Sequence, residues 1–313
     1  MAALDGVFRA RPRYVRPKGI LGVGWACVES AIAGRAEHRP TREYFDDQVV
    51  RRVHFQAGGD LGWNISALVT PRAKPARWKI VVITGAPSWA EYWAPIMAAL
   101  PPDREMVAVD RPGYGQSEPA ECVADISVQA LALAPLLAGP PEQRILLVGQ
   151  SYGAAIATLM AAAAPGRVAA LVLLSSYLGE SGPTARWLVD AGSRLKSVIP
   201  RDLRTAVIEV SGQPDQLPMM REALEDLRIP IHIIHGEVDD FAPVELARRM
   251  ASEVATRAPI RFEAVPGANH FLTDGPVESL IGRLDACLPA PVSARARIGG
   301  WVRGLARLRP SSR

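Results

Sequence analysis

The chain has 313 residues, of which 49% are hydrophobic and 22% are charged, as is usual for a globular protein with one substantial core. Its formal net charge of +4 comes from the two ends, since the first 18 residues hold five basic side chains and one acidic one, and residues 292–313 hold six arginines and no acid. The rest of the chain is therefore net acidic, which argues against a nucleic-acid-binding role for the folded body.

The three cysteines indicate neither a disulfide framework nor a zinc site. Cys27, Cys122 and Cys287 are far apart, and none has the paired spacing of metal ligands. We expect free thiols that are packed or at the surface. No metal-binding or nucleotide-binding motif occurs elsewhere, so we expect neither a metal nor another cofactor.

Residues 1–50 are predicted to form an N-terminal extension that is basic and partly apolar. Its apolar stretch, Ile20 to Ile32, is shorter than the ~20 residues that a membrane-spanning helix needs. Leu21, Trp25 and Val28 recur at helical spacing, which allows an amphipathic helix. Packing on the body, disorder and contact with a membrane interface all stay open for this stretch.

Short strands are predicted from Arg51 onward. Val53 to Gln56 and Ile65 to Thr70 are two such strands, and a turn at Gly58 and Gly59 lies between them. Their spacing predicts an antiparallel hairpin.

Buried strands and helices alternate through the middle of the chain. Apolar runs predict buried strands, and the segments between them predict helices. The expected strands are Lys79 to Thr84, Met106 to Asp110, Ile145 to Val148, Ala170 to Leu174, Ile231 to Ile234 and Ile260 to Val265. The expected helices run from near Ser88 to Leu100, from about Ser127 to Leu137, from Ala154 to Ala164 and onward from near Pro276. Such alternation is typical of a parallel sheet that helices cover on both faces.

The segment from Ile145 to Val168 contains the most informative motif. Its sequence Gly-Gln-Ser-Tyr-Gly, at 149–153, lies between a buried strand and an alanine-rich helix. A glycine two residues before and after Ser151 permits a turn so sharp that the serine is strained and its hydroxyl projects beyond the sheet. Strand, turn and helix together predict a nucleophile elbow. The alternative is an ordinary strand-to-helix turn that contains a serine.

From about residue 50 to 288 the chain resembles the α/β-hydrolase superfamily. The matching segments, in the family's order, are the glycine-containing loop at Gly85, Asp-Arg-Pro-Gly-Tyr-Gly-Gln-Ser at 110–117, the elbow, His-Gly-Glu-Val-Asp-Asp-Phe-Ala-Pro at 235–243 and Val-Pro-Gly-Ala-Asn-His-Phe-Leu at 265–272. The resemblance implies the α/β-hydrolase fold, a mostly parallel central β-sheet flanked by helices, with a helical lid insertion.

The resemblance also implies a catalytic triad of Ser151, His270 and Asp239. Asp240 is adjacent to the acid but lies outside the register usual for the family. Serine is a poor nucleophile at its ordinary pKa, so the histidine must take its proton while the aspartate fixes the imidazole tautomer and stabilises the imidazolium. A serine at this position argues against the dehalogenase and epoxide-hydrolase branches, which use an aspartate.

The remaining histidines are expected to be structural or exposed. His38 and His54 precede the core, whereas His232 lies within a predicted strand and His235 at its end. None of them follows the last strand, where the family places its base.

Two backbone N–H groups are expected to form the oxyanion hole, and the resemblance implies those of Tyr152 and Ala86. The sequence departs from the family twice nearby. Thr84-Gly85 stands where a His-Gly pair is common, which alters the hydrogen bonding expected of that loop. Ala154 stands where a second glycine is frequent, which adds one methyl group where helix and strand approach.

A long insertion follows the strand that ends near Leu174, and we expect it to form a lid at about 179–228. Its apolar residues at helical spacing, such as Trp187, Leu188 and Val207, are explained first by packing onto the body. If some also line the cleft, the substrate has an apolar part. The predicted organisation is an extension at 1–50, an α/β-hydrolase domain at 51–290 that includes the lid, and a basic tail at 291–313.

These features predict a serine hydrolase that cleaves a carboxylic ester or related acyl compound of small size through a Ser-His-Asp acyl-enzyme mechanism. The fold also hosts amidases, thioesterases, carbon–carbon hydrolases and cofactor-free haloperoxidases. A non-catalytic binding protein on the same fold is the second interpretation. The complete Ser, Asp and His set favours the hydrolase.

The C-terminal tail is basic and weakly amphipathic. Ile298, Trp301, Val302 and Leu305 recur at intervals of three and four, but three glycines weaken a helix there. A solvated, frayed tail and a helix that orders on an anionic membrane surface both stay open. We therefore expect a cytoplasmic protein, with peripheral membrane contact through its basic ends as the open question.

Overall fold

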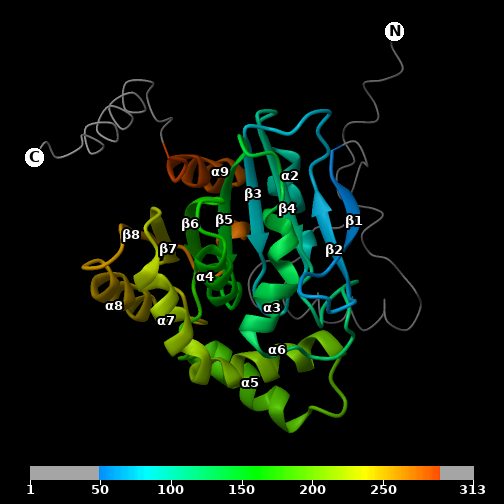
Figure 1. Ribbon diagram of the computed structural model, residues 1–313. Coiled ribbons are helices and arrows are strands. Elements are labelled where there is room, and N and C mark those ends of the chain that lie inside the picture. The colour runs from blue at the N-terminus through cyan, green and yellow to red at the C-terminus, as the bar shows by residue number, and fades with distance from the viewer. Residues whose placement is uncertain (1–48, 290–313) are drawn as a thin grey trace, which may run out of the picture.

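An eight-stranded β-sheet forms the centre of the part of the chain, residues 49–289, that this computed structural model describes (Figure 1). The strands are β1 (Arg51–Gln56), β2 (Asn64–Val69), β3 (Trp78–Ile83), β4 (Arg104–Val109), β5 (Arg144–Gln150), β6 (Val168–Leu174), β7 (Ile231–Gly236) and β8 (Ile260–Val265). Their order is β1-β2-β4-β3-β5-β6-β7-β8. β2 pairs antiparallel with β1 and with β4, and all other neighbours are parallel. The predicted hairpin and mostly parallel sheet are confirmed.

The helices form a layer on each face of the sheet and a third group beyond its carboxyl edge (Figure 1). In the described residues they are α2 (Ala94–Ala98), α3 (Ile126–Leu133), α4 (Gly153–Ala163), α5 (Pro183–Arg194), α6 (Arg201–Gly212), α7 (Leu217–Asp226), α8 (Val244–Val254) and α9 (Val277–Ala286). Short 3-10 turns are η2 (Ala90–Trp93), η3 (Ala134–Leu137), η4 (Gln213–Gln216) and η5 (Leu272–Asp274). α5 and α6 lie beyond the carboxyl ends of the parallel strands.

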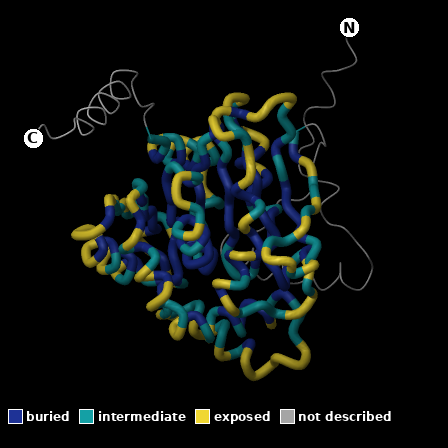
Figure 2. Tube along the Cα trace, in the orientation of Figure 1, coloured by how far each residue is buried: buried dark blue, intermediate teal, exposed yellow. Residues whose placement is uncertain are grey.

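The central strands are continuous apolar runs because helices cover both of their faces. Ile80 and Val82 of β3 pack in a cluster with α2 and α9, whereas Val81 and Ile83 pack in a cluster with α3, α4, α7 and α8. This division follows from the two-residue period of a strand. Figure 2 shows the result as a buried sheet beneath more exposed helices and loops.

Two of the predicted helices are divided into shorter elements. The helix expected to reach Leu137 is α-helical only to Leu133 and continues as η3, because Pro135 has no N–H to donate and its ring crowds the carbonyl group of Leu131. The helix expected to reach Leu100 is the 3-10 turn η2 followed by α2, with Pro95 in the first turn of α2.

The segment predicted as a lid contains helices with two different locations. Met220 and Leu224 of α7 are fully buried in the cluster that also contains α4. α5 and α6 instead pack against each other at the carboxyl edge of the sheet. We refer to residues 182–212, which include α5 and α6, as the cap.

Candidate active site

Ser151 occupies the sharp turn between β5 and α4. Its φ of 51° is in the left-handed region, which a residue with a Cβ atom rarely adopts. The flanking glycines allow this turn, because a Cβ on Gly149 would lie 2.6 Å from Cα of Ala154 and one on Gly153 would lie 2.3 Å from the carbonyl oxygen of Ile83. The close approach of α4 to the sheet leaves the serine at the carboxyl edge.

The structure brings the three predicted triad residues into one hydrogen-bonded row. Nε2 of His270 lies 3.0 Å from Oγ of Ser151, and Nδ1 of His270 lies 2.8 Å from Oδ2 of Asp239. Because an ionised carboxylate only accepts hydrogen bonds, Nδ1 carries the hydrogen and Nε2 accepts from the serine hydroxyl. A base that removes a serine proton needs this tautomer.

Asp239 is buried in a site that favours its charged form. Its Oδ1 accepts hydrogen bonds from the backbone amides of Phe241, at 2.9 Å, and Ala242, at 2.8 Å. Burial alone would raise the pKa of Asp239, but His270 and the hydrogen bonds from His235, His270 and Ala242 outweigh burial and hold the pKa well below its usual range. The carboxylate is therefore ionised at neutral pH.

His235 is a contact of this site that the sequence interpretation did not include. Its side chain is fully buried, and its Nε2 lies 3.1 Å from Oδ2 of Asp239 and 2.8 Å from the carbonyl oxygen of Ala242. Its Nδ1 has no hydrogen-bond partner within residues 49–289. The spacing of four residues to Asp239 was a usable signal, but the position at a strand end indicated packing instead.

Asp240 makes different contacts from Asp239. Its side chain accepts a hydrogen bond of 2.5 Å from Oγ1 of Thr184, at the start of α5. Its carbonyl oxygen accepts from the amide of Thr184 at 3.3 Å. Asp240 is exposed and joins the cap to the loop that carries Asp239.

Two aromatic rings hold the imidazole of His270 in place. The ring of Phe241 stacks on it, with centroids 5.3 Å apart and planes 22° apart. Phe271 meets it edge to face at 5.4 Å and 87°. Such contacts restrict rotation of the histidine without competing for its ring nitrogens.

The two predicted oxyanion donors lie next to Ser151. Tyr152 is the N-cap residue of α4, so its amide belongs to the helix end that has free N–H groups and a partial positive charge. Ala86, in the loop after β3, borders the same cleft as Ser151. That loop runs so close to the elbow that a Cβ on Gly85 would lie 3.0 Å from Cβ of Ser151.

Thr84 makes local hydrogen bonds in the position where the family commonly has histidine. Its hydroxyl donates to the carbonyl oxygen of Val109 at 2.9 Å and also bonds the hydroxyl of Ser88. Ser88 in turn accepts from the amide of Arg111 at 3.1 Å. These bonds tie the loop after β3 to the loop after β4.

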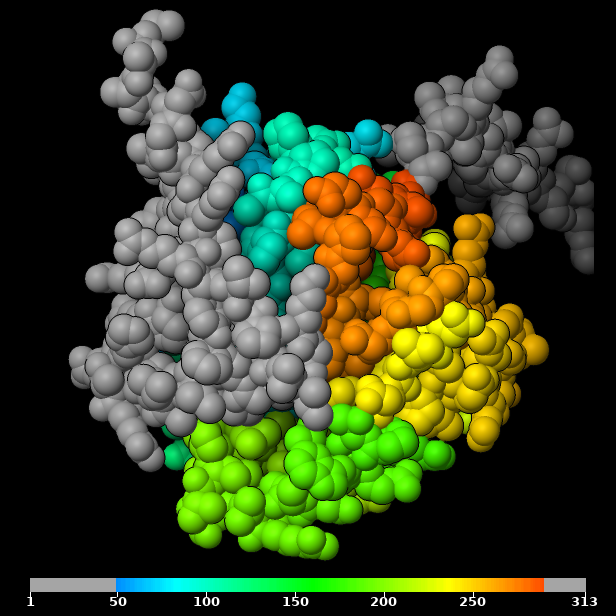
Figure 3. All heavy atoms as spheres, turned by 180° about the vertical axis from the view of Figure 1, so that it is seen from behind, coloured from blue at the N-terminus to red at the C-terminus, as the bar shows by residue number. Residues whose placement is uncertain are grey.

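The cleft above Ser151 is lined mainly by apolar and aromatic side chains. Those from the body are Ala86, Pro87, Trp89, Tyr92, Tyr177, Phe241 and Phe271, and those from the cap are Ala185, Leu188, Val189, Leu203, Ala206, Val207 and Val210. Among the described residues, no Asp, Glu, Lys or Arg lines it. Seen from behind in Figure 3, the cap, in green, lies beside the segments near residues 240 and 270, in yellow and orange.

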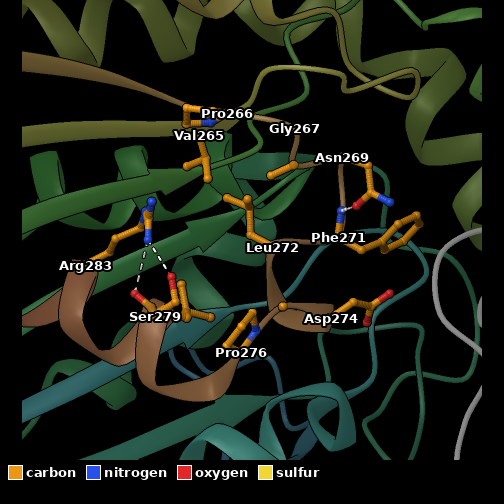
Figure 4. Close-up of a pocket in the computed structure, with 13 residues that line it drawn as sticks. Val265, Pro266, Gly267, Asn269, Phe271, Leu272, Asp274, Pro276, Ser279 and Arg283 are labelled. Carbon is orange, nitrogen blue, oxygen red and sulfur yellow. Dashed lines mark hydrogen bonds between the residues drawn. The ribbon is translucent and has the colours of Figure 1, made fainter.

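A second cavity, of about 400 Å³, borders the loop that carries His270 (Figure 4). Val265, Leu272 and Pro276 border it, and Nη1 of Arg283 donates to Oγ of Ser279 at 2.6 Å on one side. Ser151 is not among its lining residues. We therefore place the candidate active site in the apolar cleft, where all three triad residues meet.

Neither of the two cysteines within residues 49–289 belongs to the candidate active site. Cys122 and Cys287 are free, and burial raises the pKa of their thiols to about 11 and about 12. Cys27 lies outside the described residues. Within residues 49–289 no cluster of His, Cys, Asp and Glu has the arrangement of a metal site, and no helix is both long and apolar enough to span a bilayer.

Fold and site together define the class of protein. The family model of the alpha/beta hydrolase fold matches residues 80–216, and the chain belongs to this family. A solved structure with a similar fold is the esterase EaEST from Exiguobacterium antarcticum, with a TM-score of 0.58 and 18% identity over 74% of this chain and 99% of that one.

Several similar curated proteins are hydrolases. Lipase LipV of Mycobacterium tuberculosis is 36% identical over 117 residues, which span 37% of this chain but only 43% of that lipase. A pimeloyl-(acyl-carrier protein) methyl ester esterase of Pectobacterium carotovorum is 33% identical over 54% of this chain and 78% of the esterase. A 2-hydroxy-6-oxononadienedioate/2-hydroxy-6-oxononatrienedioate hydrolase of Pseudomonas putida is 25% identical over 54% and 73%. The chain is thus a hydrolase with esterase and lipase relatives.

Proposed function

We propose that the protein is a serine esterase that cleaves uncharged carboxylic esters with an apolar acyl part. The observation that carries the proposal is the hydrogen-bonded row from Ser151 through His270 to Asp239 at the base of an apolar cleft. The row supplies a nucleophile, a base and a fixed counter-charge. The cleft favours a hydrocarbon chain, because the transfer of apolar surface out of water lowers the free energy.

In the first half of the reaction, Oγ of Ser151 attacks the ester carbonyl carbon while its proton passes to Nε2 of His270. The carbonyl oxygen becomes an oxyanion, which the backbone amides of Tyr152 and Ala86 stabilise. Asp239 stabilises the imidazolium through the 2.8 Å hydrogen bond to Nδ1. The tetrahedral intermediate then collapses, and His270 gives the proton to the departing alcohol.

In the second half, water attacks the acyl-serine. His270, now neutral again, takes a proton from that water as the new oxyanion forms in the same hole. Collapse of the second intermediate breaks the bond to Oγ of Ser151, to which His270 returns the proton. The carboxylic acid leaves, and the enzyme returns to its starting state.

We propose that residues 51–290 form the hydrolase domain and that the cap, rather than the whole predicted lid, selects the substrate. Leu188 and Val189 of α5 and Val207 of α6 border the cleft. α7 makes no contribution to the lining, consistent with its burial against α4. The two cap helices therefore determine how long an acyl chain fits.

The carbon–carbon hydrolase alternative is supported by three relatives named for the same activity, from Pseudomonas putida, Burkholderia vietnamiensis and Paraburkholderia phymatum, each 25% identical. Their named substrates are dioates and carry two carboxylates. Recognition of such charges calls for arginine or lysine in the pocket. The described lining has neither, which favours neutral esters.

A binding protein without catalysis is disfavoured by the site itself. The Ser151 backbone is strained, with φ at 51°, and its hydroxyl bonds a histidine that is held in the reactive tautomer. Backbone strain of this kind destabilises a protein, and strained residues are therefore found mainly at functional sites.

A series of p-nitrophenyl esters from acetate to dodecanoate tests the proposal. We expect kcat/KM to rise with acyl length until the cleft is filled. Ser151→Ala and His270→Ala should each lower kcat/KM by at least ~10³-fold without unfolding the protein.

Leu188→Trp should lower kcat/KM for the longest esters more than for acetate. The neighbouring Trp187 is 65% exposed and outside the lining, so Trp187→Leu is the matched control. Turnover of dioates without turnover of any neutral ester would contradict the proposal.

We also propose peripheral contact with anionic membranes through the basic ends of the chain. This proposal rests on the sequence, because residues 1–48 and 290–313 lie outside the described structure. Arginines near anionic headgroups contribute about 1 kcal/mol each, and Trp301 can insert between lipids.

A further inference from the structure

A fully buried ion pair joins the cap to the body beneath the candidate active site. Arg111, which follows β4, and Glu209 of α6 have no exposed side-chain surface, and their two hydrogen bonds measure 2.7 and 2.8 Å. Tyr114 donates to Glu209 at 2.6 Å, and Gln129 donates to it at 2.7 Å. Bidentate pairing of this kind fixes the plane of the guanidinium group.

The same guanidinium group binds the loop that carries the predicted donor Ala86. Nε of Arg111 donates to the carbonyl oxygen of Thr84 at 2.8 Å, and Nη2 donates to that of Gly85 at 2.7 Å. In a trans peptide the C=O of one residue and the N–H of the next point in opposite directions. Arg111 therefore turns the N–H of Ala86 away from itself. Gly85 also approaches the side chain of Ser151, so this loop contacts both Arg111 and the elbow.

Arg111 also contacts the residue that carries the other predicted donor. Its Cζ lies 4.9 Å from the ring centroid of Tyr152, and the Tyr152 hydroxyl donates to the carbonyl oxygen of Ala124 at 3.0 Å. The ring is thus held at both its face and its tip. The amide of Tyr152 begins α4 directly after Ser151.

We infer that Arg111 is a positioning residue for the oxyanion hole, and that the cap supplies its counter-ion through Glu209. The inference rests on the proposed esterase function. One guanidinium group orients both peptide segments whose N–H groups would bind the oxyanion. Its charge can remain buried only while α6 is docked, because a buried cation without its partner is strongly unfavourable.

Further contacts make α6 a fixed wall of the site. Oδ2 of Asp202 accepts from Nε1 of Trp89 at 2.6 Å, and Nη2 of Arg201 donates to the carbonyl oxygen of Gly115 at 2.9 Å. Trp89 itself borders the cleft. The oxyanion hole and the docked cap helix therefore form one unit.

The test compares Arg111→Lys with the wild type in ester hydrolysis and in inhibition by an alkyl trifluoromethyl ketone. Oγ of Ser151 adds to the ketone carbon, the carbonyl π bond becomes an oxyanion, and the serine proton moves to His270. Lysine keeps the charge toward Glu209 but loses the fork that binds two carbonyl groups. We expect kcat to fall about 10- to 100-fold, KM to change less than about threefold, and the inhibition constant to rise by the same factor as kcat falls.

Arg104→Lys is the matched control, because Arg104 pairs with Asp285 at 2.7 Å near the amino end of β4, at the edge of the sheet opposite the site. It should leave kcat and the inhibition constant unchanged.

A folded Arg111→Lys variant whose kcat and inhibition constant both stay within threefold of wild type would overturn the positioning role. A change in KM alone would also overturn it. If Arg111→Lys does not fold, the double variant Arg111→Gln with Glu209→Gln, which leaves no unpaired charge, is judged by the same two values. A wild-type protein that hydrolyses no ester would instead contradict the proposed function.

Discussion

Asp239 makes several polar contacts in the candidate site. Its two oxygens accept from two backbone amides and lie within hydrogen-bond distance of His235 and His270. Asp239→Asn would replace an acceptor by an NH₂ group and favour the wrong tautomer of His270. We expect kcat to fall about 10³- to 10⁴-fold.

Asp240→Asn is the matched control, because Asp240 is exposed and bonds Thr184 of the cap. It should keep most of the wild-type rate in the same ester assay. The reverse ranking of the two variants would assign the acid to Asp240.

The lowered pKa of Asp239 also predicts how stability depends on pH. Its pKa in the folded protein lies below the unfolded value of about 3.9, so the ionised carboxylate stabilises the fold above pH ~4. That contribution is lost as the pH falls through the folded-state pKa. The difference in unfolding free energy between wild type and Asp239→Asn should therefore be largest at neutral pH and shrink below pH ~4. Urea denaturation at several pH values measures it, and a difference that stays constant from pH 7 to pH ~3 would contradict this linkage.

Single residues differed in how well the sequence predicted them. Ser151, His270 and Asp239 stand in local motifs, so their meeting could be predicted from fold and order. Arg111 and Glu209 are 98 positions apart, and the local sequence around each residue does not indicate that the two pair. Burial of both charges becomes visible only when α6 is placed on the body.

At the scale of elements, the contact between α4 and β3 determines where the nucleophile lies. A Cβ on Gly153 would lie 2.3 and 2.5 Å from the carbonyl oxygens of Ile83 and Thr84. Gly153→Ala should therefore destabilise the protein by about 1–3 kcal/mol. Activity should fall as well, because α4 carries the amide of Tyr152.

Gly282→Ala is the control for this substitution. Gly282 lies in α9, where an added Cβ would meet no atom within 4 Å, so alanine should stabilise the helix by up to ~1 kcal/mol. Urea denaturation of both variants provides the comparison. Equal stability of Gly153→Ala and wild type would show that α4 can shift without cost.

The place where a helix packs in the fold is harder to predict than the residues that form the helix. α5, α6 and α7 all have an apolar stripe, and the sequence does not show what each stripe faces. In the structure α7 covers the sheet, whereas α5 and α6 turn part of their stripes toward the cleft. The prediction of a lid at 179–228 therefore combined two different environments.

For the whole molecule, charge is divided between an acidic body and basic ends. If the ends bind membranes, the full chain should co-sediment with vesicles that contain anionic lipid and not with neutral vesicles, and added salt should weaken binding. A version that ends at Ala290 should sediment less. Equal sedimentation of both versions, or equal binding to neutral lipid, would contradict an electrostatic role for the tail.

The central claim is that Ser151 is an activated nucleophile, and reaction with a fluorophosphonate followed by mass spectrometry of the labelled peptide tests it most directly. We predict stoichiometric labelling of the wild type at Ser151 and no labelling of folded Ser151→Ala, because only a serine paired with a base attacks phosphorus under mild conditions. His270→Ala, which keeps the serine but lacks the base, should label far more slowly. A folded wild-type protein that stays unlabelled, or a label on another residue that persists in Ser151→Ala, would contradict the account.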